Sequence, residues 1–155
     1  MRLTAFTDFA LRALMRLAGE PGRTFTTDEI AREFQISRNH LTKVVRELAE
    51  GGFVATHRGA GGGIKLARPA ETITLGEVVR LLEARHAMVE CFRADGGSCV
   101  LTPCCRLKSK LVRAAGAFIA ELDRTTLAEC AYAAPAGSAS RAAAIKPFRR
   151  AARGK

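Results

Sequence analysis

The stretch 26–66, TTDEIAREFQISRNHLTKVVRELAEGGFVATHRGAGGGIKL, contains two helical patterns followed directly by two strand patterns. Thr26 and Glu29 have the spacing of a capping box, which predicts the start of the first helix. A turn at Gln35-Ile36 separates it from a second helix, which we expect to end at Gly51-Gly52. Two short helices joined by a tight turn are typical of a helix-turn-helix.

The second helix has an apolar face and a basic face. Its apolar residues recur at helical spacing and are expected to be buried: Leu41, Val44, Val45 and Leu48. The opposite face is polar and contains Arg38, Asn39, His40, Thr42, Lys43 and Arg46. A recognition helix enters the major groove with its N-terminus first. The candidate DNA contacts are therefore Ser37, which is also the expected N-cap, and Arg38, Asn39, His40 and Lys43. A helical hairpin with a solvated basic face is the alternative.

The segment after this helix predicts a wing. Two short apolar runs, 53–56 and 64–66, flank the glycine-rich stretch 57–63, a pattern that indicates a β-hairpin. Glycines allow the backbone at the tip to approach phosphate closely. The candidate contacts of the wing are Arg58, Gly62 and Lys65. The stretch lacks the GxGxxG order and the Lys-Ser/Thr pair of nucleotide-binding loops, which argues against nucleotide binding.

Helical patterns also lie on both sides of this region. Residues 1–18 predict an amphipathic helix whose more polar side carries Thr4, Asp8, Arg12 and Arg16. Thr74 and Glu77 predict another capping box. Thr102-Pro103 is expected to open a long helix that reaches about Ala131. Its apolar face is formed by Leu107, Leu111, Ala115, Phe118 and Leu122. So long a helix on so small a body suggests a dimer contact.

Three cysteines lie between the last two helical patterns. Seven residues separate Cys91 from Cys99 and five separate Cys99 from Cys105, which leaves room for a body larger than one ion. Cysteine thiolates are the main ligands of iron-sulfur clusters. A zinc site usually has C-x2-4-C knuckles, and the nearest match here is Cys99-x4-Cys104. Zinc, free thiols and a redox switch remain alternatives.

The three thiolates leave one position of a cluster without a ligand. Another residue or a small molecule must supply it, and an incomplete site of this kind suits a sensor. His86 and Asp95 are local candidates, although nothing in their spacing singles them out. Cys104 is adjacent to Cys105 and points in a different direction, so we expect only one of the two to bind metal.

The composition favours a polyanionic partner inside the cell. The chain has a net charge of +10 and an isoelectric point near 10.1. Residues 133–155 contain six Lys or Arg and no acid, which predicts a basic, disordered tail. Five cysteines in the reducing cytosol indicate metal or redox chemistry more than disulfides. No apolar run approaches the ~18 residues of a membrane span, so we expect a soluble cytoplasmic protein without a membrane partner.

Four segments together resemble a known family: MRLTAFTDFALRAL (1–14), SRNHLTK (37–43), RGAGGGI (58–64) and LTPCCRLK (101–108). They are similar to the IscR/NsrR family of winged-helix iron-sulfur regulators, and the likeness covers residues 1 to about 130. Within that family the chain is closer to the nitric-oxide-sensing repressors. IscR-like members have a histidine where this chain has Lys108, and they lack the Thr7-Asp8 pair.

The resemblance implies a cofactor and a mechanism. Cys91, Cys99 and Cys105 would hold one cluster per subunit, a [4Fe-4S] cluster in preference to [2Fe-2S], and Asp8 would supply the fourth ligand across a homodimer. The cluster-loaded dimer would repress transcription by binding double-stranded operator DNA and would release it when nitric oxide attacks the iron. Departures from the family pattern are the extra thiol of Cys104, the seven-residue gap between the first two cysteines, and the basic tail.

We therefore expect a mainly α protein with a winged helix-turn-helix, a small β-hairpin wing and a long C-terminal dimerisation helix. Residues 1–70 would bind DNA, 71–132 would hold the cluster and the dimer contact, and 133–155 would form the tail. The alternatives are an IscR-like iron-sulfur or redox-responsive regulator and a DNA-binding protein controlled by zinc or thiols. A thiol redox enzyme is disfavoured because the chain has no C-x-x-C motif.

Overall fold

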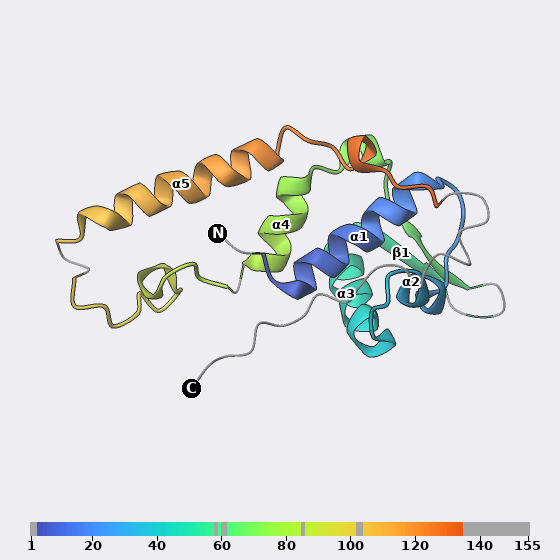
Figure 1. Cartoon of the computed structure of the whole chain (residues 1–155), viewed down its shortest axis with the longest axis horizontal. Helices are drawn as coiled ribbons and strands as arrows, with labels where there is room; N and C mark the ends of the chain where they lie inside the picture. Colours follow the sequence, from blue (N-terminus) through green and yellow to red (C-terminus); the bar gives the residue numbers. More distant parts are fainter. Residues whose placement is uncertain (1–2, 58, 60–61, 85, 102–103, 135–155) are drawn as a thin grey trace.

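The computed structural model describes residues 3–57, 59, 62–84, 86–101 and 104–134. Figure 1 shows helices and a hairpin grouped into one body, with helix α5 lying beside α4 and extending past it. The elements are α1 (Ala5–Gly19), α2 (Thr27–Glu33), α3 (Arg38–Glu50), β1 (Val54–His57), β2 (Gly63–Leu66), η1 (Ala70–Thr72), α4 (Leu75–Glu83), η2 (Glu90–Phe92), α5 (Arg106–Leu122) and η3 (Ala128–Cys130).

The predicted helix-turn-helix is present as α2 and α3. The capping box forms as expected: the Thr26 hydroxyl accepts from the Glu29 amide (3.1 Å), and the Glu29 carboxylate accepts from the Thr26 amide (2.7 Å). The turn between the helices places Gln35 at a φ of 54°. The Ile36 amide then donates to the carbonyl of Ala31 (2.9 Å), which sets the direction in which α3 begins.

One hydrophobic core joins both halves of the chain. Leu14 of α1, Leu41 of α3, Val78 of α4 and Leu127 beyond α5 are all fully buried in the same cluster. The helix-turn-helix thus shares its core with the segment that leads to the cysteines. The expected division at residue 70 concerns the roles of the two segments, DNA binding before it and cluster binding and dimerisation after it, and it stays a prediction.

The long C-terminal helix is shorter than predicted. It runs from Arg106 to Leu122 with Cys105 at its N-cap, whereas we expected it to run from Thr102-Pro103, which lie outside the described residues, to about Ala131. The helix ends early because the chain turns back onto the core. The Leu127 amide donates to the carbonyl of Ile73 (2.8 Å), and the Leu127 side chain is fully buried.

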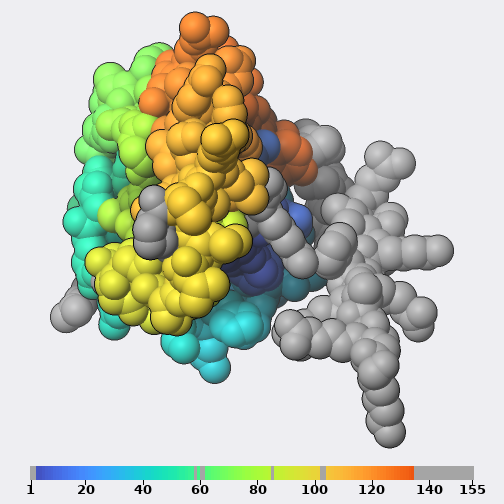
Figure 2. Space-filling view, turned by 90° about the vertical axis from the view of Figure 1, so that its left-hand side faces the viewer, coloured from blue at the N-terminus to red at the C-terminus, as the bar shows by residue number. Residues whose placement is uncertain are grey.

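Helix α5 has no buried residue, although its central part is apolar. Phe118 and Leu111 are half-buried, whereas Leu107, which we expected on the same face, is 61% exposed. Val112 is 52% exposed. In Figure 2, α5 lies across the outside of the molecule with the cysteine loop below it. A dimer contact along α5 accords with this exposure and stays a prediction. None of the helices in the described ranges combines the length and apolar character that a membrane crossing needs.

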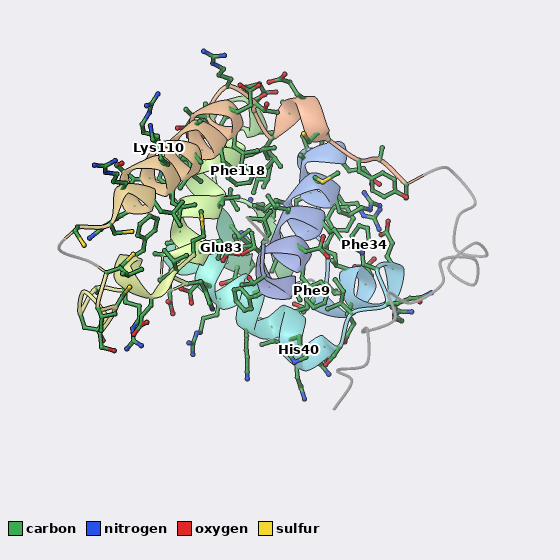
Figure 3. The ribbon with its side chains drawn as sticks, turned by 60° about the vertical axis from the view of Figure 1, so that its left-hand side comes forward. Phe9, Phe34, His40, Glu83, Lys110 and Phe118 are labelled. Atoms are coloured by element: carbon green, nitrogen blue, oxygen red, sulfur yellow. The ribbon has the colours of Figure 1, made fainter. Side chains whose placement is uncertain are left out.

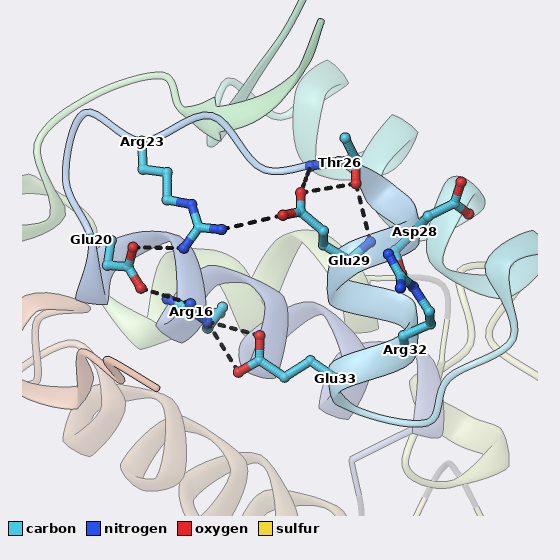
Figure 4. Close-up of polar contacts among 8 residues, drawn as sticks. All are labelled: Arg16, Glu20, Arg23, Thr26, Asp28, Glu29, Arg32 and Glu33. Atoms are coloured by element: carbon cyan, nitrogen blue, oxygen red, sulfur yellow. Dashed lines mark hydrogen bonds and ion pairs between the residues drawn. The ribbon is translucent and has the colours of Figure 1, made fainter. Parts of the chain in front are cut away.

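Arg16 was predicted on the polar side of α1, but it is only 3% exposed. Its Nε lies 3.0 and 2.9 Å from the two carboxylate oxygens of Glu33, and its Nη2 lies 2.7 Å from Glu20. Figure 4 shows Arg16 between these two carboxylates. Its guanidinium also covers the Phe25 ring at 4.5 Å. Burial opposes the charge, but the hydrogen bonds to both carboxylates outweigh it and raise the pKa of Arg16. Arg16 therefore joins α1 to α2.

Replacing Arg16 with Met should lower the free energy of unfolding by about 1–3 kcal/mol, because it leaves the Glu33 carboxylate without its charged donor. Urea denaturation would measure the change. Arg46→Met is the matched control, because Arg46 pairs with Glu50 at 3.4 Å with both side chains more than 60% exposed. Such exposed pairs contribute roughly 0–1 kcal/mol. Equal losses in the two variants would contradict the role given to Arg16.

Candidate functional site

Helix α3 has one face in the core and the opposite face open to solvent. Leu41, Val44 and Leu48 are fully buried. The predicted groove contacts are all exposed: Ser37, Arg38, Asn39, His40 and Lys43. Figure 3 shows His40 on the outer side of α3. The structure thus brings these five side chains together on one surface at the start of the helix.

Ser37 differs from expectation, and Arg38 and Thr42 have partners within this chain. Ser37 occupies the N-cap position, but its side chain makes no capping hydrogen bond, so the predicted capping role of its hydroxyl is wrong. Arg38 is not a free cation, because its Nε lies 3.0 Å from the carboxylate of Asp28 on α2. The Thr42 hydroxyl donates to the carbonyl of Arg38 (2.9 Å), so it is engaged within the helix.

The wing is the antiparallel hairpin of β1 and β2, with His57 opposite Gly63 at its outer end. Phe25 adds one bridge on the other side of β2, where its amide and that of Ile64 exchange hydrogen bonds of 2.9 and 2.7 Å. Gly63 makes this approach possible, because a Cβ there would lie 2.4 Å from the Phe25 carbonyl oxygen. The wing is therefore attached to the segment that leads into α2.

The structure describes two of the three candidate contacts of the wing. Lys65 is exposed on β2. Gly62 is half-buried, and its amide donates to the carbonyl of Gly59 (2.9 Å). Arg58 lies outside the described residues. Lys65 is thus a cation next to the recognition helix in the chain and available to a phosphate.

The cysteine candidates lie on one loop between α4 and α5. Cys91 is in η2, Cys99 follows it, and Cys105 caps α5. These three thiols are half-buried, Cys104 is exposed, and none is in a disulfide. Over the residues that the structure describes, no three Cys, His, Asp or Glu side chains are grouped closely enough to hold a metal ion. The structure places the candidates on one loop but does not bring them into one coordination set.

A carboxylate closes this loop between the first two candidate ligands. Glu90 accepts hydrogen bonds from the amide (3.1 Å) and hydroxyl (2.8 Å) of Ser98, which lower the pKa of Glu90. Gly97, at a φ of +61°, permits the turn, because a Cβ there would lie 2.6 Å from the Glu90 carbonyl oxygen. Glu90 directly precedes Cys91, and Ser98 directly precedes Cys99. The closed turn therefore keeps the backbones of these two cysteines near each other.

The third candidate thiol lies at the positive end of α5. Cys105 is the N-cap, and the first turn has no acidic residue. Arg106, Lys108 and Lys110 add positive charge to the partial charge of the helix N-terminus. Three thiols with one at a cationic helix start are a donor set that fits an anionic iron-sulfur cluster.

The candidates for the fourth ligand have other partners within this chain. Asp8 forms an ion pair with Arg12, with N–O distances of 2.8 and 3.1 Å, and both side chains are 46% exposed. Asp95 accepts from Arg93 (2.7 Å), and His86 is exposed. The ligand role of Asp8 concerns a second subunit and stays a prediction.

Glu83 is a site residue that the sequence did not single out. It ends α4 just before the cysteine loop, and its Oε1 accepts from the Thr4 amide (2.8 Å), the Thr4 hydroxyl (2.9 Å) and the Thr7 hydroxyl (2.5 Å). Thr7 precedes Asp8 on α1. Burial alone would raise the pKa of Glu83, but these hydrogen bonds outweigh it and lower the pKa. Figure 3 shows Glu83 between the cysteine loop and α1.

Replacing Glu83 with Ala should lower the free energy of unfolding at pH 7 by about 1–3 kcal/mol, since it removes a charged acceptor shared by three donors. A lowered folded-state pKa means that the charge stabilises the protein above the unfolded pKa, near 4.5, and that this contribution is lost as the pH falls through the folded value. The difference in stability between wild type and variant, measured by denaturation, should therefore shrink as the pH falls below about 4.5. A difference that persists unchanged at pH 3 would contradict this account.

The chain is similar to regulators of known families. A sequence profile described as Rrf2, iron-dependent transcriptional regulator, matches residues 3–133. The HTH-type transcriptional regulator NsrR of Bacillus subtilis is 47% identical over 128 residues, which cover 82% of this chain and 88% of that protein. These matches confirm the resemblance described above.

Solved structures confirm the fold class. CymR, the global cysteine regulator of B. subtilis, has a TM-score of 0.69 and 28% identity over 86% of this chain and 99% of its own. IscR of T. potens has a TM-score of 0.65 at 23% identity over 94% of this chain and 93% of its own, a likeness of fold alone.

Proposed function

The chain belongs to the Rrf2 family of iron-dependent transcriptional regulators, and we propose that it is a homodimeric repressor controlled by nitric oxide through an iron-sulfur cluster. The cluster-loaded dimer binds double-stranded operator DNA, and exposure to nitric oxide releases it. One observation carries the DNA-binding part: α3 exposes basic and amide side chains at its start, while its opposite, apolar face is fully buried and fixes the helix in place. The 47% identity to a regulator named NsrR supports the sensing part.

The reading surface suits the major groove. Arg and Asn side chains bond well to guanine and adenine edges, respectively, and Arg38 and Asn39 both project from the first turn of α3. Lys43, one turn further on, and Lys65 on the wing add positive charge for phosphates. The protein would act in the cytoplasm, as expected for a transcriptional regulator that binds DNA. Membership of a family of regulators also supports the expectation that it is not an enzyme.

Three thiols of this chain would hold the cluster. Cys91, Cys99 and Cys105 would bind one cluster per subunit, [4Fe-4S] in preference to [2Fe-2S]. When bound, such a cluster supplies iron that reacts with nitric oxide. The Glu90–Ser98 bonds hold the first two ligand backbones together, and the third ligand lies at the cationic start of α5, which suits an anionic cluster. An IscR-like regulator of the same family is the second candidate, which the Lys108 position disfavours.

Asp8 of one subunit would bind the cluster of the other and so link that cluster to its own DNA-binding region. Within one chain it forms an exposed i,i+4 ion pair with Arg12. Exposed pairs of this kind contribute only about 0.3–0.5 kcal/mol, so the carboxylate can exchange Arg12 for iron at little cost. Asp8 of the partner subunit would then draw α1 of that subunit towards the cluster. The unburied α5 supplies a surface along which the two subunits could meet.

Protein isolated without oxygen should be coloured, and its affinity for a promoter duplex should fall on addition of nitric oxide. A colourless protein with stoichiometric zinc would instead support the zinc-controlled alternative. Cys91→Ala, Cys99→Ala and Cys105→Ala should each abolish the visible absorbance, because each removes one of three thiolates. Cys104→Ala and Cys130→Ala are the matched controls and should retain it. A colourless Cys104 variant beside a coloured Cys105 variant would reverse the assignment of the adjacent pair.

Asp8→Ala should keep iron bound by the three thiolates but change the visible and resonance Raman spectra, because the oxygen ligand is lost. It should also weaken the dependence of DNA affinity on the cluster. Asp95→Ala and His86→Ala are the controls, since both residues lie closer to the cysteines in the chain. An unchanged spectrum together with an unchanged nitric oxide response in Asp8→Ala would exclude this role.

A further inference from the structure

A carboxylate lies beside the first base-reading candidate. Asp28, in the first turn of α2, forms an ion pair with Arg38, the first residue of α3, at 3.0 Å. The two residues border a hollow of about 350 Å³ between the helices, whose other lining residues are Ala31, Arg32 and Ile36. Figure 4 shows Asp28 at the start of α2, on the side away from the Arg16 cluster. An acidic side chain thus lies at the edge of the α3 surface that is proposed to bind DNA.

The ion pair has little value for stability. The Arg38 and Asp28 side chains are 71% and 51% exposed, and exposed pairs of this kind contribute roughly 0–1 kcal/mol. The more important effect of the ion pair is on the orientation of the Arg38 side chain. A guanidinium has five donors in a rigid fork, so a bond through Nε leaves other donors for a base edge. An Arg38 held in this way loses less freedom when it bonds a base than an unrestrained one.

Phosphates are the competing partners of an arginine in a DNA-binding surface. They line every duplex, so an unrestrained arginine strengthens binding to any sequence. A carboxylate at this position repels phosphate and retains the arginine, both of which act against non-operator DNA. Lys43 at the middle of α3 has no such acid among the ion pairs of the described residues. Among the charged groove candidates of α3, Arg38 is thus the one that an acid engages in the described part of the chain.

We propose that Asp28 is a specificity-determining residue of the DNA interface, which holds Arg38 in a base-reading orientation and repels phosphate from it. The proposal rests on the base-reading role of Arg38 given above. It predicts that loss of the Asp28 charge changes the ratio of specific to non-specific affinity rather than the fold. Asp28 itself need not touch a base.

The test uses cluster-loaded full-length protein and two duplexes at one fixed salt concentration. One duplex is selected by the wild-type protein from a random-sequence pool, and the other has the same composition in scrambled order. Asp28→Asn should tighten binding to the scrambled duplex and reduce the preference for the selected one by about 2- to 10-fold. The slope of log K against log salt for the scrambled duplex should steepen by ~0.9 if Arg38 gains one phosphate contact.

Glu50→Gln is the matched control. It removes the same charge from the ion pair that Glu50 forms with Arg46 at the far end of α3, the helix that carries Arg38. It should strengthen binding to both duplexes equally and leave the preference unchanged. Circular dichroism checks that α2 is retained in Asp28→Asn, which keeps a polar side chain in the first turn. Arg38→Ala breaks the same pair without altering α2, and Asp28→Asn should have no further effect on the preference in that background.

The outcomes separate the inference from the function on which it rests. If Asp28→Asn affects both duplexes as Glu50→Gln does, or if its effect persists in the Arg38→Ala background, the role of Asp28 is wrong while the base-reading proposal stands. If the wild-type protein selects no sequence, or if Arg38→Ala leaves the preference intact, the base-reading proposal itself fails. A preference lost in Asp28→Asn only when Arg38 is present supports the inference.

Discussion

The Glu83 carboxylate holds together the two parts of the molecule that a sensor must connect. It accepts three hydrogen bonds from Thr4 and Thr7 at the start of α1, and the cysteine loop begins directly after it. At the other end of the same helix, Arg16 bonds Glu33 of α2. Thr7 and Arg16 are nine positions apart, a rise of about 14 Å along the helix. Helix α1 is thus fixed at one end to the segment that bears the thiols and at the other end to α2 of the helix-turn-helix.

This arrangement explains which features could be predicted from the sequence. The capping boxes at Thr26 and Thr74 and the buried stripe of α3 depend on residues three or four positions apart, so local patterns reveal them. Glu83 forms hydrogen bonds with Thr7 and Thr4, which lie 76 and 79 positions away in the chain, and no local spacing pattern predicts such contacts. Arg16 looked like a surface cation because Glu33 and Phe25, which help to bury it, come from segments beyond α1, although its other acid, Glu20, lies only four positions away.

The C-terminal half shows the same limit. The pattern of α5 predicted a long helix correctly, but its end is decided by Leu127, which returns to bond Ile73 in the core. The cysteine loop could be recognised from its thiols alone, whereas its closure by Glu90 and Ser98 required the folded chain. How three thiols converge on a cluster cannot be read from spacing, because the free energy of metal binding itself contributes to folding such a site.

Affinity and selectivity for DNA come from different parts of this chain. The net charge of +10 attracts any duplex and decays within a Debye length of about 8 Å at physiological salt. Reading a sequence needs a few donors whose positions do not vary. The fully buried face of α3 fixes the backbone from which Arg38 and Asn39 project, and α1 fixes α2 beside it. Helix α1 also contacts the cysteine-bearing segment through Glu83. A displacement of that segment would therefore move α2 and α3 together while leaving the net charge unchanged. Control by a cluster on this fold should therefore act mainly on sequence-specific binding.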